Sequence, residues 1–395
     1  MGPLAFIGLF FAAPVGRLLG DAGQASELGA ASALGLSVDL GGLVWFTILQ
    51  AAVSAGLCLV FGLPIAYLLY RRRVVGQRLW RALLTLPFVL PTLVVAIGVR
   101  AITDGWGPDG WASNGCSALA GILIAHLLLN VSIVVRGVGA AWARLDMSQE
   151  ESAEVAGAGR LRTFWAVILP QLRGAIAGSA ALAFLYCATS FSVILVLGGG
   201  FVRTVETQIS LAANDYLDLR TASTLAIVQT LITVAAFALS GRVGWGVAGA
   251  GPAGDSGEPH SRVADRRDLP ALVLSLGPLV IVVVAILGSL AFKALSQPDG
   301  SIGPQNFANL QGFGARDLLD ISVLDALANS LRNALVSTAV SLVVGTLVAW
   351  LLAHSRCRIA ARVLEALFML PLGTSTVVLG LGWLLFFAEP PLALR

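Results

Sequence analysis

Long apolar runs, separated by short loops in which arginine gathers, constrain the fold of this chain more than any other feature. Hydrophobic residues make up 57% of its 395 residues, charged residues make up 12%, and the mean hydropathy is +0.86. A soluble domain carries about a quarter charged residues, so this chain lacks the polar surface to face water. The sequence predicts an all-α polytopic membrane protein, surrounded by lipid.

A transmembrane helix needs about 20 mainly apolar residues. The N-terminal run follows no basic segment, so we interpret it as a short first helix rather than a signal peptide. We expect about nine transmembrane helices in all. The runs lie at 3–19, 42–70, 82–103, 118–140, 174–198, 223–241, 269–295, 329–353 and 364–387.

Arginine residues gather in every second loop between these runs. The loop at 104–117 has Asp104 and Asp109 but no lysine or arginine. The positive-inside rule then places the basic loops and the N-terminus in the cytoplasm, in a multi-pass protein of the cell membrane. The net charge of +3 is small for this length and argues against a nucleic-acid partner.

Two parts of the sequence repeat each other. Residues 49–73 align with residues 332–356, and the next helices align after a one-residue insertion. The matched pairs are Ala51 with Ala334, Ser54 with Ser337, Gly62 with Gly345, Ala66 with Ala349, Pro87 with Pro371 and Gly98 with Gly382. The repeats should run parallel, related by an axis along the membrane normal. We expect a first six-helix unit at 1–241, a Gly-rich cytoplasmic linker at 242–268 and a second unit at 269–395.

The basic loop at 146–171 has its own helix signals. Ser148–Glu151 forms a capping box, Gly157 or Gly159 can end the helix in a left-handed cap, and a second short helix from about Arg160 should stop before Pro170. Apolar residues at helical spacing on that helix are Leu161, Phe164, Trp165 and Ile168. This face is too short to span a membrane, so it should dock in a partner's groove or rest on the membrane surface.

This loop resembles the ATPase-docking loop of ABC importer permeases. Glu151-Ser152-Ala153 stands where the family has Glu-Ala-Ala, Gly157-Ala158 matches the central glycine, and the tail ends in Leu169-Pro170. Ser152 is a mild departure from the family pattern. The resemblance implies that the docking residues are Glu151, Ala153, Gly157, Ala158, Phe164, Leu169 and Pro170.

Residues 185–229 and 379–394 further resemble thiamine and ferric-iron importer permeases, which fuse two six-helix units of the MetI-like fold. The resemblance implies a permease that moves a small solute, thiamine or ferric iron, inward by alternating access. It implies as partners a dimer of ABC ATPase subunits, an extracytoplasmic substrate-binding protein and membrane lipid. A sulfate- or polyamine-type permease has the same fold and loop.

The sequence lacks a Walker phosphate-binding loop, so we expect this chain to be no enzyme and to bind no cofactor, with ATP used by the partner. The four cysteines show no metal-ligand or disulfide spacing. A secondary transporter with two parallel six-helix repeats is the rival class. Such a transporter should pair acidic residues inside the membrane, and the apolar runs contain almost none.

Polar residues within the apolar runs are candidates for the solute pathway. His126 and Asn130 are four residues apart and share a helix face, although bonding between helices would explain them equally well. Further pore candidates are Thr189, Ser190 and Ser192, whose hydroxyls could instead bond their own helix backbone.

By the internal repeat, the counterpart of Glu151 would fall about 284 residues later, beyond Arg395. We therefore expect the second unit to be incomplete, without its last three helices and its own docking loop.

Overall fold

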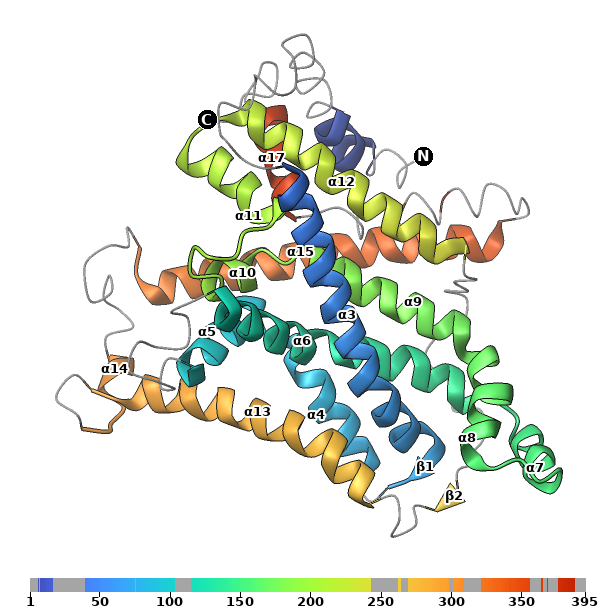
Figure 1. Ribbon diagram of the computed structural model, residues 1–395. Coiled ribbons are helices and arrows are strands. Elements are labelled where there is room, and N and C mark those ends of the chain that lie inside the picture. Colours follow the sequence, from blue (N-terminus) through green and yellow to red (C-terminus); the bar gives the residue numbers. More distant parts are fainter. Residues whose placement is uncertain are drawn as a thin grey trace. The chain divides into compact units, whose positions relative to one another are not determined.

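The computed structural model (Figure 1) describes the part of the chain given by these residue ranges: 6, 8–16, 40–74, 76–103, 115–242, 262–263, 269–297, 301–308, 321–355, 364, 368 and 376–387. Contacts between Cα atoms divide the chain into two compact units. The larger unit comprises Leu18–Ile286 and Gly373–Leu381, and the smaller comprises Met1–Arg17, Leu287–Leu372 and Gly382–Arg395. The domain boundaries expected from the sequence stay a prediction.

The described residues are almost entirely helical, which confirms the predicted all-α class. The exception is a pair of two-residue parallel strands, β1 (Arg72–Arg73) and β2 (Arg262–Val263). The helices from α3 to α9 are α3 (Leu40–Arg71), α4 (Gln77–Val89), α5 (Thr92–Thr103), α6 (Gly115–Ala143), α7 (Met147–Val155), α8 (Arg160–Thr163), the π-helix η3 (Phe164–Ile168) and α9 (Leu169–Ala188). The later ones are α10 (Ser192–Leu197), α11 (Val205–Ser210), η4 (Leu211–Asp215), α12 (Leu219–Arg242), α13 (Leu269–Leu295), α14 (Gln305–Ala308), α15 (Val323–His354) and α17 (Thr376–Phe387), and η1 (Gly8–Ala12) precedes them all.

Six helical segments of the described residues are long and apolar enough to cross a membrane. Five of them correspond to the runs predicted at 42–70, 118–140, 223–241, 269–295 and 329–353, although the third ends at Ala236 and the fourth begins at Leu276. The sixth, Leu161–Ala188, replaces the run predicted at 174–198. For the runs at 3–19 and 364–387 the structure describes only part of the residues, and most of the linker at 242–268 lies outside the described residues.

The run predicted at 82–103 is bent in the structure. α4 and α5 meet at an angle of 97°, and together they could form a seventh, broken span. Leu90, between them, has an extended backbone (φ −64°, ψ 144°). The ring of Pro91 disfavours the helical region for the residue before it, and the chain turns there.

α3, α6 and α9 form the core of the larger unit, around the buried side chains of Cys58, Val134, Val138 and Leu172. Gly62 of α3 lets α6 approach closely, because a Cβ there would lie 2.7 Å from a methyl carbon of Val134. Small residues at such crossings allow transmembrane helices to gain dispersion contacts where lipid gives no hydrophobic drive.

Candidate functional site

The first helix of the predicted docking loop begins with a different cap from the one expected. Asp146 is the N-cap of α7, and its carboxylate accepts hydrogen bonds from the backbone N–H of Ser148 at 3.0 Å and from the Ser148 hydroxyl at 2.7 Å. The capping box predicted to start at Ser148 was therefore wrong. An aspartate two residues earlier supplies an N-cap oxygen, so Ser148 lies inside the first turn.

The end of α7 is capped as predicted at Gly157. The backbone there has φ +84°, in the left-handed region that favours glycine. The N–H of Gly157 donates to the carbonyl of Glu154 at 3.0 Å, and the N–H of Ala158 donates to the carbonyl of Ala153 at 2.9 Å. These two bonds make a Schellman motif, which fixes the direction in which the chain leaves α7.

Side-chain hydrogen bonds anchor α7 to two long helices of the bundle, at the end of α3 and the start of α9. Arg71, at the end of α3, pairs with Glu150 at 2.7 Å and donates to the carbonyl of Leu145 at 3.0 Å. The amide of Gln171 in α9 donates to Gln149 at 2.8 Å. Because Arg71 is only 5% exposed and Glu150 15%, this ion pair is shielded from solvent and should hold the loop firmly.

The prediction that the second loop helix stops before Pro170 was also wrong. α8, η3 and α9 run on without a break, and Pro170 lies in the first turn of α9. Proline lacks the N–H that an α-helix interior needs. The π-turn of Phe164–Ile168 adds one residue at this point, which lets the helix pass through the proline.

The apolar face predicted on this helix divides in two. Phe164 stacks on Trp142, with ring centres 6.1 Å apart, and Ile168 is buried in the same core cluster. Leu161 and Trp165 point outward, with 74% and 61% of their surface exposed, and Val155 of α7 is 90% exposed. We call Val155, Leu161 and Trp165 the exposed loop surface.

The seven predicted docking residues lie on or beside this surface in sequence. Glu151, Gly157 and Pro170 are exposed, whereas the others are partly buried: Ala153, Ala158, Phe164 and Leu169. The list omitted all three residues of the exposed loop surface, although the helical spacing of Leu161 and Trp165 indicates an apolar strip. Val155 gave no such signal, because its exposure depends on where α7 ends.

His126 and Asn130 lie deep in the bundle, on the same face of α6. The hydroxyl of Ser54 in α3 bonds His126 Nδ1 at 3.1 Å, and the Asn130 amide donates to the His126 carbonyl at 3.0 Å and to Cys187 Sγ at 3.4 Å. The bonds of His126 to Ser54 and of Asn130 to Cys187 join different helices, as in the alternative that the sequence left open, whereas the bond from Asn130 to the His126 carbonyl lies within α6. A role in the solute pathway stays a prediction.

The three hydroxyl residues of the predicted pore set lie where α9 gives way to α10. Thr189 donates to the carbonyl of Leu185 at 2.9 Å, so its hydroxyl bonds its own helix. Ser190 and Ser192 are partly buried.

Two glutamines that the site prediction missed hold the end of α9. Gln50 of α3 donates to the Cys187 carbonyl at 3.1 Å, and Gln229 of α12 donates to the Ala188 carbonyl at 3.1 Å. A helix end leaves such carbonyls without internal partners, and inside a membrane water cannot replace them. The sequence signal for both residues was a glutamine side chain within a long apolar run.

The fold and the site define a class of protein: a polytopic helical membrane protein with an anchored, partly apolar loop at one end of its bundle. Residues 58–298 match the family described as binding-protein-dependent transport system inner membrane component. This match covers more than half of the chain, and the chain belongs to that family of multi-pass membrane components of transport systems. The resemblance to ABC importer permeases is confirmed at the level of the family, which is a transport component and not itself catalytic.

The curated relatives are transport permeases. The thiamine transport system permease protein ThiP of Brucella abortus (strain 2308) is 31% identical over 231 residues, which is 55% of this chain and 42% of that protein. ThiP of Escherichia coli (strain K12) is 30% identical over 274 residues, which is 65% of this chain and 51% of that protein. The sulfate transport system permease protein CysT of E. coli (strain K12) is 32% identical over 165 residues, 40% of this chain and 60% of that protein.

The chain spans about half the length of the thiamine permeases that it matches. Among solved structures, an inward-facing form of the MetNI methionine ABC transporter is 19% identical to this chain. The match covers 52% of this chain and 95% of that chain, with a TM-score of 0.40.

Proposed function

We propose that this chain is the transmembrane permease subunit of an ATP-binding-cassette importer, which moves a small solute inward while a separate ATPase hydrolyses ATP. The observation that carries the proposal is the docking loop. The loop exposes the apolar side chains of its exposed loop surface, yet it is fixed by the Schellman motif at Gly157 and by the buried pair of Arg71 and Glu150. A fixed apolar surface on a short helical loop suits the groove of a protein partner.

The same loop offers a route for transmitting motion. α8, η3 and α9 form one continuous helical segment from Arg160 to Ala188, so a displacement at the loop would move α9 along its length. Its far end is held by Gln50 and Gln229 at the point where the helix is interrupted. ATPase closure would therefore reach the interior of the bundle through α9, in support of alternating access.

The remaining partners and the orientation follow from the proposal. The docking loop and the N-terminus face the cytoplasm, by the distribution of arginine among the loops. Two ATPase subunits act on the cytoplasmic side, a substrate-binding protein delivers the solute on the other side, and lipid surrounds the spans. No cofactor is bound by this chain itself.

Thiamine is the solute that we propose first, since the thiamine permeases of B. abortus and E. coli are similar to this chain. Ferric iron is the alternative within the same subfamily, and the similarity to CysT favours sulfate as a second candidate. Uptake of labelled thiamine, ferric iron and sulfate, measured with the binding protein encoded beside this chain, would discriminate them. Uptake of sulfate alone would contradict the thiamine assignment.

The docking proposal is tested by co-purification of the full chain with its candidate ATPase from mild detergent. We expect Gly157→Asp to abolish the association, because a side chain is strained at φ +84° and the added carboxylate alters the surface. Trp165→Ala should weaken it at least tenfold, the usual size of loss for a buried aromatic anchor. Trp45→Ala is the matched control, because Trp45 is 65% exposed and lies at the start of α3, far in sequence from the loop.

Loss with Gly157→Asp and Trp165→Ala but not with Trp45→Ala would support the docking site. Retention in all three variants would contradict the site while leaving the permease assignment standing. If even the wild-type chain retains no ATPase, the proposed function itself is wrong and a secondary transporter becomes the alternative.

A further inference from the structure

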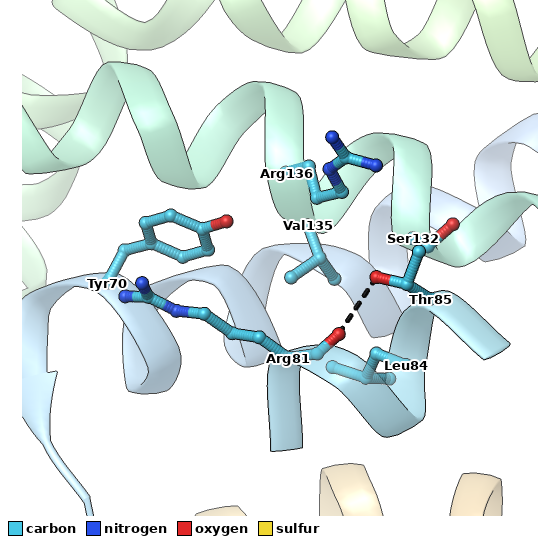
Figure 2. A pocket seen from close by; sticks show the side chains of 7 residues that line it. All are labelled: Tyr70, Arg81, Leu84, Thr85, Ser132, Val135 and Arg136. Atoms are coloured by element: carbon cyan, nitrogen blue, oxygen red, sulfur yellow. Dashed lines mark hydrogen bonds between the residues drawn. The ribbon is translucent and has the colours of Figure 1, made fainter. Parts of the chain in front are cut away.

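A small pocket near the docking-loop end of the larger unit is lined by two arginines that the proposed function does not use. It encloses about 80 Å³ between α4 and α6, beside the last turn of α3. Figure 2 shows Arg81 extended toward the ring of Tyr70, with Arg136 and Ser132 on the α6 side. Its lining residues are Tyr70, Arg81, Leu84, Thr85, Ser132, Val135 and Arg136. This volume is several times what one water needs, so a phosphate-sized group could occupy it.

Arg81 is held in place by α3. Its guanidinium carbon lies 4.0 Å from the centre of the Tyr70 ring, and one of its terminal nitrogens donates to the Leu69 carbonyl. The Nε of Arg81 is buried and has no hydrogen-bond partner among the described residues. A guanidinium carries five donors, so this fixed group still has donors to offer a ligand.

Arg136 lies inside an apolar helix, where a charge is costly. It is roughly 10 Å along the axis from the end of α6 and is exposed. Among the residues that the structure describes, Arg136 makes no hydrogen bond or ion pair. The hydroxyl of Ser132, on the preceding turn, is likewise unbonded within the described part of the chain, although Ser132 is only 2% exposed.

No acidic residue lines the pocket. Glu150, the acidic residue that reaches the nearby end of α3, is already paired with Arg71. Two positive groups beside a low-dielectric region repel each other and disfavour that arrangement, unless an anion from outside the chain neutralises them. Planar arginine donors match phosphate oxygens well.

The surroundings of the pocket indicate where the anion comes from. The other face of α4 is exposed and apolar, with Leu79 two turns before Leu86 and Val89 about one turn after it. Such a face lies against acyl chains at the membrane boundary. A phosphate that reaches Arg136 beside this face is most readily delivered on a lipid, and basic pockets between transmembrane helices bind anionic headgroups elsewhere.

We propose that Arg81 and Arg136 bind the phosphate group of an anionic membrane phospholipid, with Ser132 as an additional donor. The site would join α4 to α6 in the leaflet on the docking-loop side. Because no ATPase or transported solute takes part, this proposal stands or falls separately from the proposed function.

The experiment measures the lipid retained by the full chain in nanodiscs of mixed phosphatidylglycerol and phosphatidylcholine, by native mass spectrometry. We expect the wild type to retain phosphatidylglycerol and Arg136→Gln to retain it about five- to tenfold more weakly. Arg78→Gln is the matched control: it removes the same charge from an exposed position on α4 that does not line the pocket. Arg136→Lys keeps the charge but not the planar donors, and should fall between wild type and Arg136→Gln.

Equal retention in wild type, Arg136→Gln and Arg78→Gln would overturn the proposal, as would equal weakening in both glutamine variants. A parallel thermal melt in detergent, with inorganic phosphate as the probe, distinguishes the source. Stabilisation by inorganic phosphate that Arg136→Gln removes, without selective lipid retention, would overturn the lipid as ligand and assign the pocket to soluble phosphate. Because Arg136 has no partner to lose, its replacement should leave the fold intact, which gel filtration checks.

Discussion

α3 and α15 are the same helix in two environments. Each has 32 residues, and both the first and the last residue of α15 lie 283 positions after those of α3. In the most apolar stretch of α3, 44% of the residues are buried, against 6% in α15. The repeat that the sequence indicated therefore extends over the whole length of both helices. Their packing differs, because α3 is largely buried and α15 is not.

The comparison separates the features that a helix needs in order to form from those that depend on its neighbours. The buried face of α3 contains Thr47, Gln50, Ser54, Cys58 and Arg71. The same positions of α15 hold small or polar residues, all exposed: Ser330, Asn333, Ser337, Ser341 and His354. Backbone hydrogen bonds and apolar side chains are enough to form both helices. We call these five positions of each helix the polar stripe. The polar stripe stabilises the fold only where α6 and α9 supply hydrogen-bond partners for it.

The largest difference should appear at the C-terminal ends of the two helices. Arg71→Ala removes the partner of Glu150 and leaves a largely buried carboxylate unpaired, which should lower the free energy of unfolding by about 3 kcal/mol. His354→Ala, at the matching position, removes only an exposed ring bonded to the Trp350 carbonyl of its own helix, and should change stability by less than about 0.5 kcal/mol. Denaturant titration of the full chain in mild detergent measures both.

A second substitution makes the Arg71 result specific to the ion pair. If the loss comes from the unpaired carboxylate, adding Glu150→Gln to Arg71→Ala should recover part of the stability, because a neutral amide is less costly to bury. Equal losses for Arg71→Ala and His354→Ala would show that the burial of α3 has no energetic consequence at this end.

The next difference concerns the glycines at the matched positions Gly62 and Gly345. A Cβ on Gly62 would lie 2.7 Å from one Val134 carbon and 2.9 Å from another, so Gly62→Ala should cost about 1–3 kcal/mol through overpacking. A Cβ on Gly345 meets nothing within 4 Å, and Gly345→Ala should stabilise the helix by up to about 1 kcal/mol. Opposite signs in the same unfolding titration are the expected result. A loss at Gly345 would reveal a close neighbour of α15 in solution.

The sequence predicted the long helices closely because their signal is local. The run at 42–70 became Leu40–Arg71 and the run at 118–140 became Gly115–Ala143, since hydropathy alone determines which residues need the bilayer. The bend between α4 and α5 was also readable, because Pro91 stands in the middle of the predicted run at 82–103. Hydropathy alone does not show this bend, whereas the restriction that proline places on Leu90 does.

The loop at 146–171 has features that local sequence signals determine and others that depend on neighbouring helices. The left-handed cap at Gly157 was predictable, since glycine tolerates positive φ and the helix signal stopped there. The choice of Asp146 over Ser148 as N-cap was a competition between two good caps, settled by where α6 ends. That Phe164 faces inward while Trp165 faces outward depends on the position of Trp142, a residue of another helix. No spacing within the loop encodes that contact.

The smallest difference tests the polar stripe itself. Ser54→Ala removes the hydroxyl that bonds His126 Nδ1 at 3.1 Å, on a ring whose Nε2 already has no hydrogen-bond partner within the described residues. Hydrogen bonds between transmembrane helices average about 0.6 kcal/mol and reach about 1.7, so the loss should lie in that range. Ser337→Ala, on the exposed α15, should change the free energy of unfolding by less than the error of the titration. Equal effects would mean that the polar stripe stabilises each helix through bonds to its own backbone. A loss of stability confined to Ser54→Ala would show that the polar stripe stabilises the protein through bonds to partner helices.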